Sequence, residues 1–310
     1  ADIAKQVLAR NRSPERTNQR NGYRERRWDT RVGTIDLAIP KLRRGSYFPD
    51  WLLDPRQRSE RALVAAVVES LLAAGFPPRN ILIWDKQLSD LSRSGFVELG
   101  KRLGVRVAGS IESGFDAASF YENSILGTPV WGDLEFGKKG EAIGRKSHVT
   151  TLLTRDITKI ISIAPLLNHN HAGVTGHLYS LALGSVDNAI RFENNPDRLA
   201  TAVPEICAVP ELFDRMTLFI TDALICQYQG EQRSLLHYST ALNQLRFSRD
   251  PVALDVLSAH ELEQQRRQAE SPLRKPKLDL FRNASLLEMG ISDPAKIRVE
   301  RAGKPEPSKN

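Results

Sequence analysis

The densest group of chemically reactive side chains lies between residues 164 and 177. An apolar run ends there in the polar sequence NHNHAGVTGH, which spans residues 168–177. Imidazole nitrogens bind transition metals and exchange protons near neutral pH. His169 and His171 would share one face if the backbone stays extended, because alternate residues of a strand point the same way. The spacing indicates a proton-transfer pair or two ligands of a divalent metal. The alternative is that both histidines are polar turn residues that cap a sheet.

The same turn has the composition of a ligand-binding loop. Gly173 and Gly176 leave backbone amides open to an anion near the start of a helix, and Asn168 and Thr175 add polar side chains. The fingerprints of dinucleotide and P-loop sites are absent from the sequence. We therefore expect these four residues to contact a small ligand whose identity, like that of any cofactor, stays open.

Two aspartates follow apolar runs of the strand type. Asp85 comes after Ile-Leu-Ile-Trp, and Asp222 comes after Leu-Phe-Ile-Thr. If their strands are neighbours of the histidine strand, both carboxylates converge with His169 and His171 into a catalytic site at one rim. Each aspartate is equally suited to cap the next helix.

A further pair of aspartates belongs to a predicted helix start. Asp250 has the place of a cap, with Pro251 in the first turn. Asp255 is one turn inside that helix, and the sequence leaves its direction open.

Hydrophobic periodicity supplies the elements that position these residues. Apolar runs typical of buried strands alternate with amphipathic or apolar stretches typical of helices. The expected strands are residues 80–84, 105–108, 159–167 and 216–221, and the expected helices are residues 62–74, 88–103, 251–270 and 280–289. This alternation predicts an α/β fold with a largely parallel mixed sheet flanked by helices. We expect one domain over residues 62–303 and a disordered tail over residues 304–310.

The first 61 residues differ in charge from everything that follows. They hold 15 Lys and Arg against 8 Asp and Glu, whereas the remainder holds 29 of each. A basic, partly disordered N-terminal segment of this kind predicts a polyanionic partner, since neutralising phosphates releases counterions. The alternative is a solvated leader without a partner. The predicted DNA contacts are Arg20, Tyr23, Arg24, Arg26, Arg27, Trp28, Arg31, Lys41, Arg43 and Arg44.

Composition excludes several other classes. The longest nearly apolar stretch, residues 62–76, is too short to span a bilayer and contains Glu69, so we expect no membrane partner. No signal peptide is recognisable at the start. Cys207 and Cys226 lack metal-type spacing, which predicts reduced thiols, a cytoplasmic location and no iron–sulfur cluster bound by this chain.

One long segment carries a specific family resemblance. Residues 20–49 read RNGYRERRWDTRVGTIDLAIPKLRRGSYFP, and the resemblance continues through Asp54-Pro-Arg56 to about Leu63. This stretch resembles the N-terminal region of bacterial Mutator-type insertion-sequence transposases. The resemblance implies recognition of the element's DNA ends. The family's metal-binding carboxylate core, which strand transfer needs, is not recognisable after Arg61. The implied function is DNA binding without transposition by this chain alone.

The rest of the chain resembles a different bacterial family. Residues 63–302 are similar to domain of unknown function 362, through LLAAG at 71–75, ILIWD at 81–85, residues 168–176, TDAL at 221–224 and RDPVALD at 249–255. That resemblance implies a fold and a site, and no reaction. The two resemblances overlap at residues 62–70, which indicates a fusion. The competing hypotheses are a metal- or ligand-binding enzyme that acts through the His169/His171 loop, and a fusion without a selected function.

Overall fold

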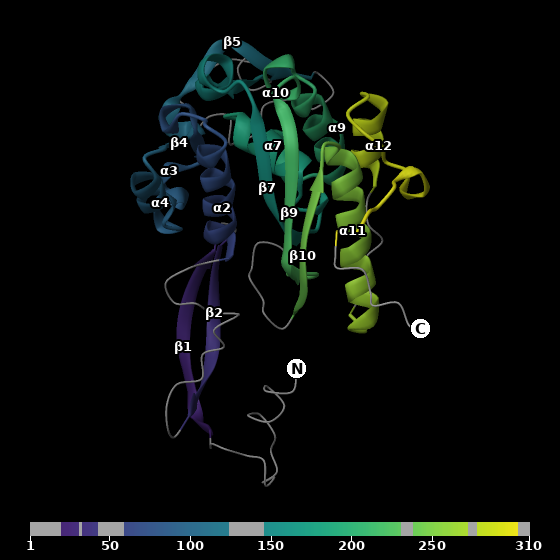
Figure 1. Ribbon diagram of the computed structural model, residues 1–310. Helices are drawn as coiled ribbons and strands as arrows, with labels where there is room; N and C mark the ends of the chain where they lie inside the picture. The colour runs from purple at the N-terminus through teal and green to yellow at the C-terminus, as the bar shows by residue number, and fades with distance from the viewer. Residues whose placement is uncertain are drawn as a thin grey trace, which may run out of the picture.

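The chain is a mixed α/β protein (Figure 1). Among the residues that the structure describes, the strands form four small sheets. The computed structural model describes residues 20–30, 33–42, 59–123, 146–230, 238–271 and 278–302. The predicted contacts Arg31, Arg43 and Arg44 and the predicted tail at 304–310 lie outside these ranges. The α/β class is confirmed.

The central sheet has four strands in the order β10-β9-β7-β8. Strands β7 (Ile160–His169) and β9 (Met216–Gln227) are parallel, whereas β10 (Ser239–Ser248) and β8 (Gly173–Val174) are antiparallel to their neighbours. The prediction of a largely parallel sheet is therefore wrong. Its cause is local, because β7 and β9 are each followed by a strand that turns straight back, and short connections join antiparallel strands.

The register of β7 against β9 shifts near the end of β7, between Pro165 and Leu167. Ile163 pairs with Ile220 and Pro165 with Asp222, but Leu167 pairs with Gln227. Proline has no amide hydrogen to donate to a ladder, so strand irregularities are common at this residue. The shift lies immediately after Pro165. As a result, the end of β7 pairs with Gln227 at the end of β9 and not with the middle of that strand.

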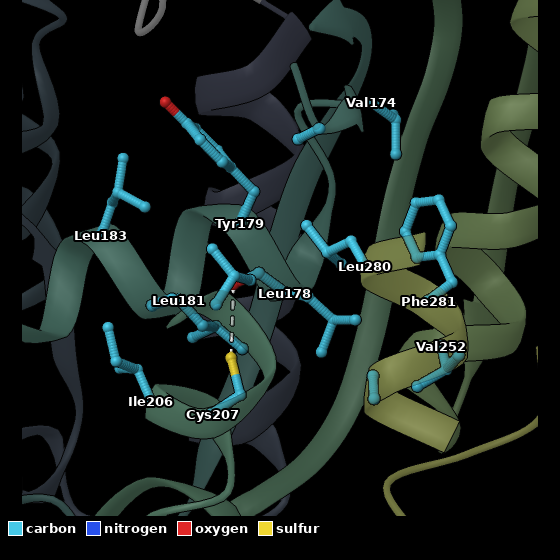
Figure 2. Packing of buried hydrophobic residues seen from close by; sticks show 14 of the residues in the cluster. Val174, Leu178, Tyr179, Leu181, Leu183, Ile206, Cys207, Val252, Leu280 and Phe281 are labelled. Carbon is cyan, nitrogen blue, oxygen red and sulfur yellow. Dashed lines mark hydrogen bonds between the residues drawn. The ribbon is translucent and has the colours of Figure 1, made fainter. Parts of the chain in front are cut away.

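Helices α7 (His177–Ser185), α9 (Pro196–Cys207), α11 (Pro251–Gln268) and α12 (Asp279–Leu286) enclose the large core together with this sheet. Figure 2 shows part of its packing, including Leu178 of α7 and Phe281 of α12. Cys207 points at α7 and donates to the carbonyl of Leu178 at 3.3 Å. Burial raises the pKa of the Cys207 thiol beyond its usual range. Both cysteines are free thiols.

The predicted cap of α11 is confirmed. Asp250 accepts a hydrogen bond from the amide of Ala253 at 2.8 Å, and Pro251 occupies the first turn. The predicted helix over residues 88–103 is two helices, α3 (Leu88–Arg93) and α4 (Phe96–Leu103). They are separated at Gly95, whose φ of 79° is a left-handed conformation that glycine adopts without strain.

A smaller core has its buried residues between Val64 and Val105. It is built by α2 (Ser59–Ala73), α3, α4 and the parallel pair β3 (Leu82–Asp85) and β4 (Arg106–Gly109). Ile163 of β7 packs against this small core, and Trp84 of β3 packs against the large one. The two cores are therefore in contact.

Two further antiparallel pairs complete the sheets. Strands β1 (Arg20–Thr30) and β2 (Gly33–Leu42) form a ribbon of their own, in which Trp28 pairs with Ile35. Strand β5 (Phe115–Glu122) pairs with β6 (Lys146–Thr150). No helix in the described part of the chain is long and apolar enough to cross a membrane.

Short helical segments make up the remaining connections. They are the 3₁₀ helices Pro78–Asn80 and Pro294–Lys296, the π-helical turn Leu152–Asp156, and α5 (Ser110–Ser113), α8 (Ile190–Glu193) and α10 (Pro210–Phe213).

A buried hydroxyl links the two cores. Ser110 accepts a hydrogen bond from Trp84 Nε1 at 2.7 Å and donates to the carbonyl of Gly184 at 2.6 Å. Ser110→Ala is expected to lower the free energy of unfolding by about 1–3 kcal/mol, because it leaves two polar groups without partners. Urea unfolding measures the change. Ser70→Ala is the matched control: this exposed hydroxyl bonds only within its own helix, so we expect almost no loss. Equal losses in both variants would contradict the link.

Candidate functional site

The histidine turn connects β7 to β8 and is held by one of its own imidazoles. His169 pairs with Gly173, whose φ is +85°. The Nδ1 atom of His169 accepts hydrogen bonds from the amide of Ala172 at 2.9 Å and from the amide of His171 at 3.3 Å. Its ring packs on Tyr179, with centroids 4.3 Å apart. His169 thus has a structural role in closing the turn.

His171 does not share an extended face with His169. Strand β7 ends at His169, and residues 170–172 form the turn itself. The two rings meet edge to face with their centroids 6.0 Å apart. Within the described ranges, no three His, Cys, Asp or Glu residues form a group that could hold a metal ion.

The predicted ligand residues Asn168 and Thr175 are both buried. Asn168 Oδ1 accepts a hydrogen bond from the guanidinium of Arg266, whose Nε donates to the carbonyl of Tyr228 at 2.7 Å. The amide of Thr175 donates to the carbonyl of Leu167 at 2.7 Å. These contacts join the histidine turn to α11 and to β7.

Gly176 lies where the N-terminus of α7 meets a carboxylate of the protein itself. Asp255 Oδ1 and Oδ2 accept hydrogen bonds from the amides of His177 and Leu178, each at 2.9 Å. The sequence leaves the direction of the Asp255 side chain open, and in the structure this side chain points toward α7. A Cβ atom on Gly176 would lie 2.2 Å from Asp255 Oδ1. The helix start predicted to bind an anionic ligand is therefore occupied by Asp255.

His177 joins the two parallel strands from inside the core. Its side chain is fully buried, with Nδ1 2.9 Å from Ser162 Oγ on β7 and Nε2 3.0 Å from Thr221 Oγ1 on β9. Both ring nitrogens have hydroxyl partners, so this imidazole is satisfied by the core. The arrangement fixes the start of α7 against the sheet.

The structure does not bring the four predicted catalytic residues to one rim. Asp222 lies inside β9 opposite Pro165, and its carboxylate accepts a hydrogen bond from the amide of Leu224 at 3.1 Å. Asp85 ends β3 in a different sheet and accepts from the amide of Lys86 at 2.7 Å. Strand β9 is a neighbour of the histidine strand, whereas β3 pairs with β4.

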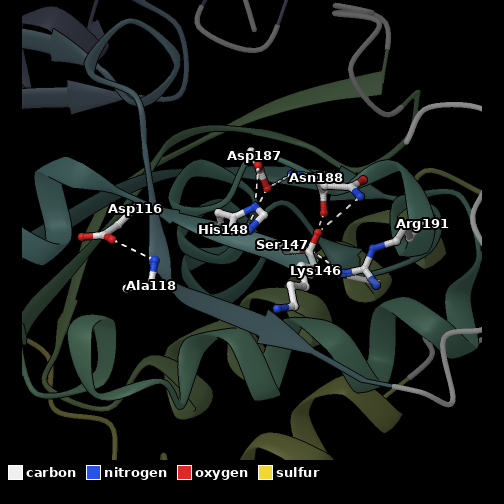
Figure 3. A network of polar contacts seen from close by, with 8 residues as sticks. All are labelled: Asp116, Ala118, Lys146, Ser147, His148, Asp187, Asn188 and Arg191. Carbon is white, nitrogen blue, oxygen red and sulfur yellow. Dashed lines mark hydrogen bonds and ion pairs between the residues drawn. The ribbon is translucent and has the colours of Figure 1, made fainter. Parts of the chain in front are cut away.

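A polar network that sequence reasoning missed lies beside β6 (Figure 3). Ser147 donates to the carbonyl of Asn188 at 2.6 Å and accepts from the guanidinium of Arg191 at 2.5 Å. Arg191 is only 2% exposed. The network therefore anchors the segment between α7 and α8 to β6.

The adjoining pair in this network is His148 and Asp187. His148 Nδ1 lies 3.1 Å from Asp187 Oδ2, and the amides of His148 and Asn188 donate to Asp187 Oδ1 at 2.7 and 2.6 Å. The signal in the sequence is weak, because His148 and Asp187 each stand alone in their own segments. Their contact depends on the pairing of Val149 with Val186.

Lys86 is a half-buried cation near the same segment. Burial lowers the pKa of its ammonium group, and the charges of Glu193 and Asp187 oppose that shift. Within the described residues, the ammonium has no hydrogen bond or ion pair.

Comparison with known proteins finds similarity to transposases in the first third of the chain. The model of the family "Transposase, Mutator family" matches residues 2–102. The transposase for insertion sequence element IS1081 of Mycobacterium tuberculosis is 52% identical over 96 residues, covering 30% of this chain and 23% of the relative. The transposase for element IS256 in transposon Tn4001 of Staphylococcus aureus is 40% identical over 70 residues, covering 23% of this chain and 17% of the relative. The transposase for element ISRM5 of Rhizobium meliloti is 37% identical over 94 residues, covering 30% of this chain and 23% of the relative.

These matches confirm a Mutator-family transposase region at residues 2–102, which extends past the predicted end at Leu63. The chain spans about a quarter or less of the length of these relatives. No solved structure matches the chain significantly. The comparisons contribute nothing on domain of unknown function 362, so that resemblance stays a prediction.

The close approach of Gly176 and Asp255 is testable by adding one methyl group. Gly176→Ala is expected to destabilise the protein by about 1–3 kcal/mol, since the core must move to admit the new carbon. Gly184→Ala is the matched control, because its nearest neighbour, Trp84, would be 4.0 Å away. Thermal unfolding of both variants measures the difference. A Gly176→Ala protein as stable as Gly184→Ala would contradict the geometry.

The buried carboxyl of Asp255 predicts a pH dependence. Burial raises its pKa from 3.8 to about 7, against the opposing effect of the two amide hydrogen bonds. Between these values the native state binds more protons than the unfolded state, so the free energy of unfolding falls as pH rises through this window.

Between about pH 5 and pH 8, the titration of Asp255 is expected to lower the free energy of unfolding by on the order of 2 kcal/mol. Urea unfolding at both pH values measures it. Asp255→Asn has no titrating group at this position, so subtracting its profile isolates the effect. Two parallel profiles would show that Asp255 does not titrate in this range.

Proposed function

We propose that residues 1–61 bind DNA and that residues 62–303 are a separate α/β domain whose reaction is unassigned. The observation that carries the DNA-binding proposal is the Mutator-family match at residues 2–102. The relatives are named as transposases of insertion sequences, and proteins of that kind act on DNA.

The charge distribution supports the same segment as the contact surface. The entire formal surplus of +7 lies in residues 1–61. Arginine guanidinium groups match phosphate geometry with paired hydrogen-bond donors. A balanced remainder contributes no net attraction for a polyanion.

The ribbon of β1 and β2 supports a docking geometry. A two-stranded antiparallel ribbon fits the major groove of B-DNA, where base edges differ between all four base pairs. The register pairs Arg24 with Ile39 and Arg26 with Leu37. Positions 24, 26 and 28 alternate along β1 and fall on one face of the ribbon. Arg24, Arg26 and Trp28 are therefore the residues we propose to contact DNA from one face, with Arg20, Tyr23, Arg27 and Lys41 contributing along the two strands.

Packing supports a boundary near residue 61 instead of residue 102. The transposase match includes Trp84, which is joined through Ser110 to Gly184. Ile163 packs against the small core that lies within and just beyond the match. Residues 62–110 thus make specific contacts with the larger domain. This favours a structural boundary before α2, whereas the sequence match to the transposases continues to residue 102.

We propose DNA binding without strand transfer. The matched region corresponds to at most 23% of each relative named above. Strand transfer needs carboxylates gathered around two metal ions. The part of the chain that resembles the transposases supplies contacts to DNA, and we assign it no chemical step.

The salt dependence of DNA binding tests this proposal. The full chain is titrated onto labelled duplex DNA at several salt concentrations, and fluorescence anisotropy gives the affinity. Replacing Arg24, Arg26 and Arg27 by alanine is expected to weaken binding and to make the slope of log K against log salt shallower by about 3.

Three exposed arginines of the α/β domain provide the control. Arg93, Arg267 and Arg282 lie on helices, and their replacement by alanine removes the same charge far along the chain from the ribbon. We expect the control to retain the original slope. Binding that ignores ionic strength, or equal weakening by both triple variants, would refute the proposal.

A further inference from the structure

We propose that the small core carries a second DNA contact surface, a basic patch formed by Arg79, Lys101, Arg102 and Arg106 with the exposed ring of Phe76. The four cations bind phosphates of the DNA backbone, and the ring packs against the sugars or bases beside them. This inference rests on the DNA binding proposed above and extends it from the ribbon to the folded domain.

The fold brings the two turns that carry the patch together. Strands β3 and β4 are parallel, so their amino ends lie at the same edge of their sheet. The amide of Arg106 donates to the carbonyl of Ile81 at 3.0 Å. A Cβ atom on Gly104, which ends α4, would lie 3.9 Å from the Cβ atom of Pro78. The last turn of α4 therefore lies against the 3₁₀ turn that holds Arg79.

Three of the four cations are available to a ligand. Arg79, Lys101 and Arg102 are exposed, and their charged groups form no hydrogen bond or ion pair with any residue that the structure describes. Arg106 is half exposed and donates to Asp156 Oδ2 at 2.5 Å. Figure 1 shows α4 at the outer edge of the molecule, on the side opposite α12. A large partner can therefore approach this end of the small core.

The carboxylates of this region do not cancel the charge of the patch. Asp156 compensates Arg106. Glu98 lies one turn before Lys101 and Arg102 on α4, but it forms no ion pair with either of them in the described structure. Two carboxylates against four cations leave a surplus of two positive charges. A polyanion is the complement of such a surface, because its binding also releases counterions.

Phe76 adds an aromatic surface beside the cations. Its amide donates to the carbonyl of Leu71 at 3.1 Å, which fixes the chain after α2, and the residue remains 54% exposed. Arg79 follows three positions later, so the two Cα atoms are at most about 11 Å apart. Aromatic rings stack on bases, and guanidinium groups pair with phosphates. The combination favours a nucleic acid over a small inorganic anion.

The similarity to transposases covers the patch as well as the ribbon. The Mutator-family match ends at residue 102 and includes Phe76, Arg79, Lys101 and Arg102. The charge of residues 62–310 is balanced as a whole, so attraction for DNA in this part of the chain depends on local clusters. A DNA contact in the small core gives a role to the part of the match that follows residue 61.

The alternative role of two of these cations is structural. Cations in the last turn of a helix stabilise it through its free carbonyl groups, and Lys101 and Arg102 occupy that place in α4. Arg79 lies outside α4 and has no such role in this helix. Measuring DNA affinity and thermal unfolding on the same variants separates a DNA contact from stabilisation of α4.

The salt dependence of DNA binding by the full chain tests the patch. Replacing Arg79, Lys101 and Arg102 by alanine is expected to weaken binding to labelled duplex DNA severalfold. The slope of log K against log salt should become shallower by about 2–3, because up to three phosphate contacts are lost. The control is the triple variant of exposed helical arginines described for the ribbon. It removes the same charge and is expected to keep the original slope.

The ribbon variant separates this inference from the proposed function. A patch variant that matches the control, while the ribbon variant loses slope, refutes the patch and leaves the ribbon as the DNA contact. The opposite result supports the patch and refutes the ribbon. Binding by the original chain that ignores ionic strength refutes both.

The aromatic contact has a different signature from the cations. Phe76→Ala is expected to weaken DNA binding severalfold with the slope unchanged, because a neutral ring displaces no counterions. Phe247→Ala is the matched control, since Phe247 is 60% exposed on β10. Equal affinities of the two variants would remove Phe76 from the contact surface.

Lysine footprinting tests the patch without any substitution. Acetic anhydride acetylates exposed lysines, and peptide mass spectrometry gives the rate for each one. Saturating duplex DNA is expected to slow the reaction of Lys101 severalfold and to leave Lys296, exposed on the last 3₁₀ helix, unchanged. Equal protection of both lysines, or none at Lys101, overturns the proposal. Protection of Lys101 by phosphatidylserine vesicles and not by DNA also overturns it, in favour of a membrane surface.

Discussion

The capping of α7 by the carboxylate of Asp255 is the contact on which the large core depends. A fully buried carboxylate is costly unless hydrogen bonds compensate for lost water. Here two amides at the start of α7 provide them. The same contact requires the chain to pass Asp255 without a side chain, which only Gly176 permits. One carboxylate thereby fixes α11, α7 and the end of the histidine turn relative to one another.

The histidine turn is satisfied by neighbours that this contact brings into place. Arg266, three turns further along α11, reaches Asn168. His177, the first residue of α7, holds Ser162 and Thr221 together across the parallel strands. His169 closes the turn with its own ring nitrogen. Most polar side chains of this segment are thus bonded inside the chain, whereas Thr175 Oγ1 is buried without a hydrogen-bond partner among the described residues.

The sequence was informative where local physics decides the outcome. Asp250 and Pro251 start a helix because their types fit only that place, and the apolar runs before Asn168 and Asp222 are strands. Sheet order was not accessible, since β10 and β8 are short of distinctive signals and their direction depends on how the chain turns back. Asp222 does not end its strand, because β9 continues after it through Ala223-Leu224-Ile225-Cys226 to Gln227. The meeting of His148 with Asp187 depends on tertiary pairing across 39 residues, which no local pattern encodes.

The contact between Asp255 and α7 also constrains the order in which the protein can be completed. During synthesis, α7 leaves the ribosome long before the carboxylate that caps it, because the partners are 78 residues apart in the chain. Until α11 has been synthesised, the first amides of α7 have no carboxylate to bind, and the apolar surface that α11 covers in the folded protein stays exposed. A message interrupted within this interval would release a polypeptide with an open interior, the kind of species that chaperones retain and proteases remove.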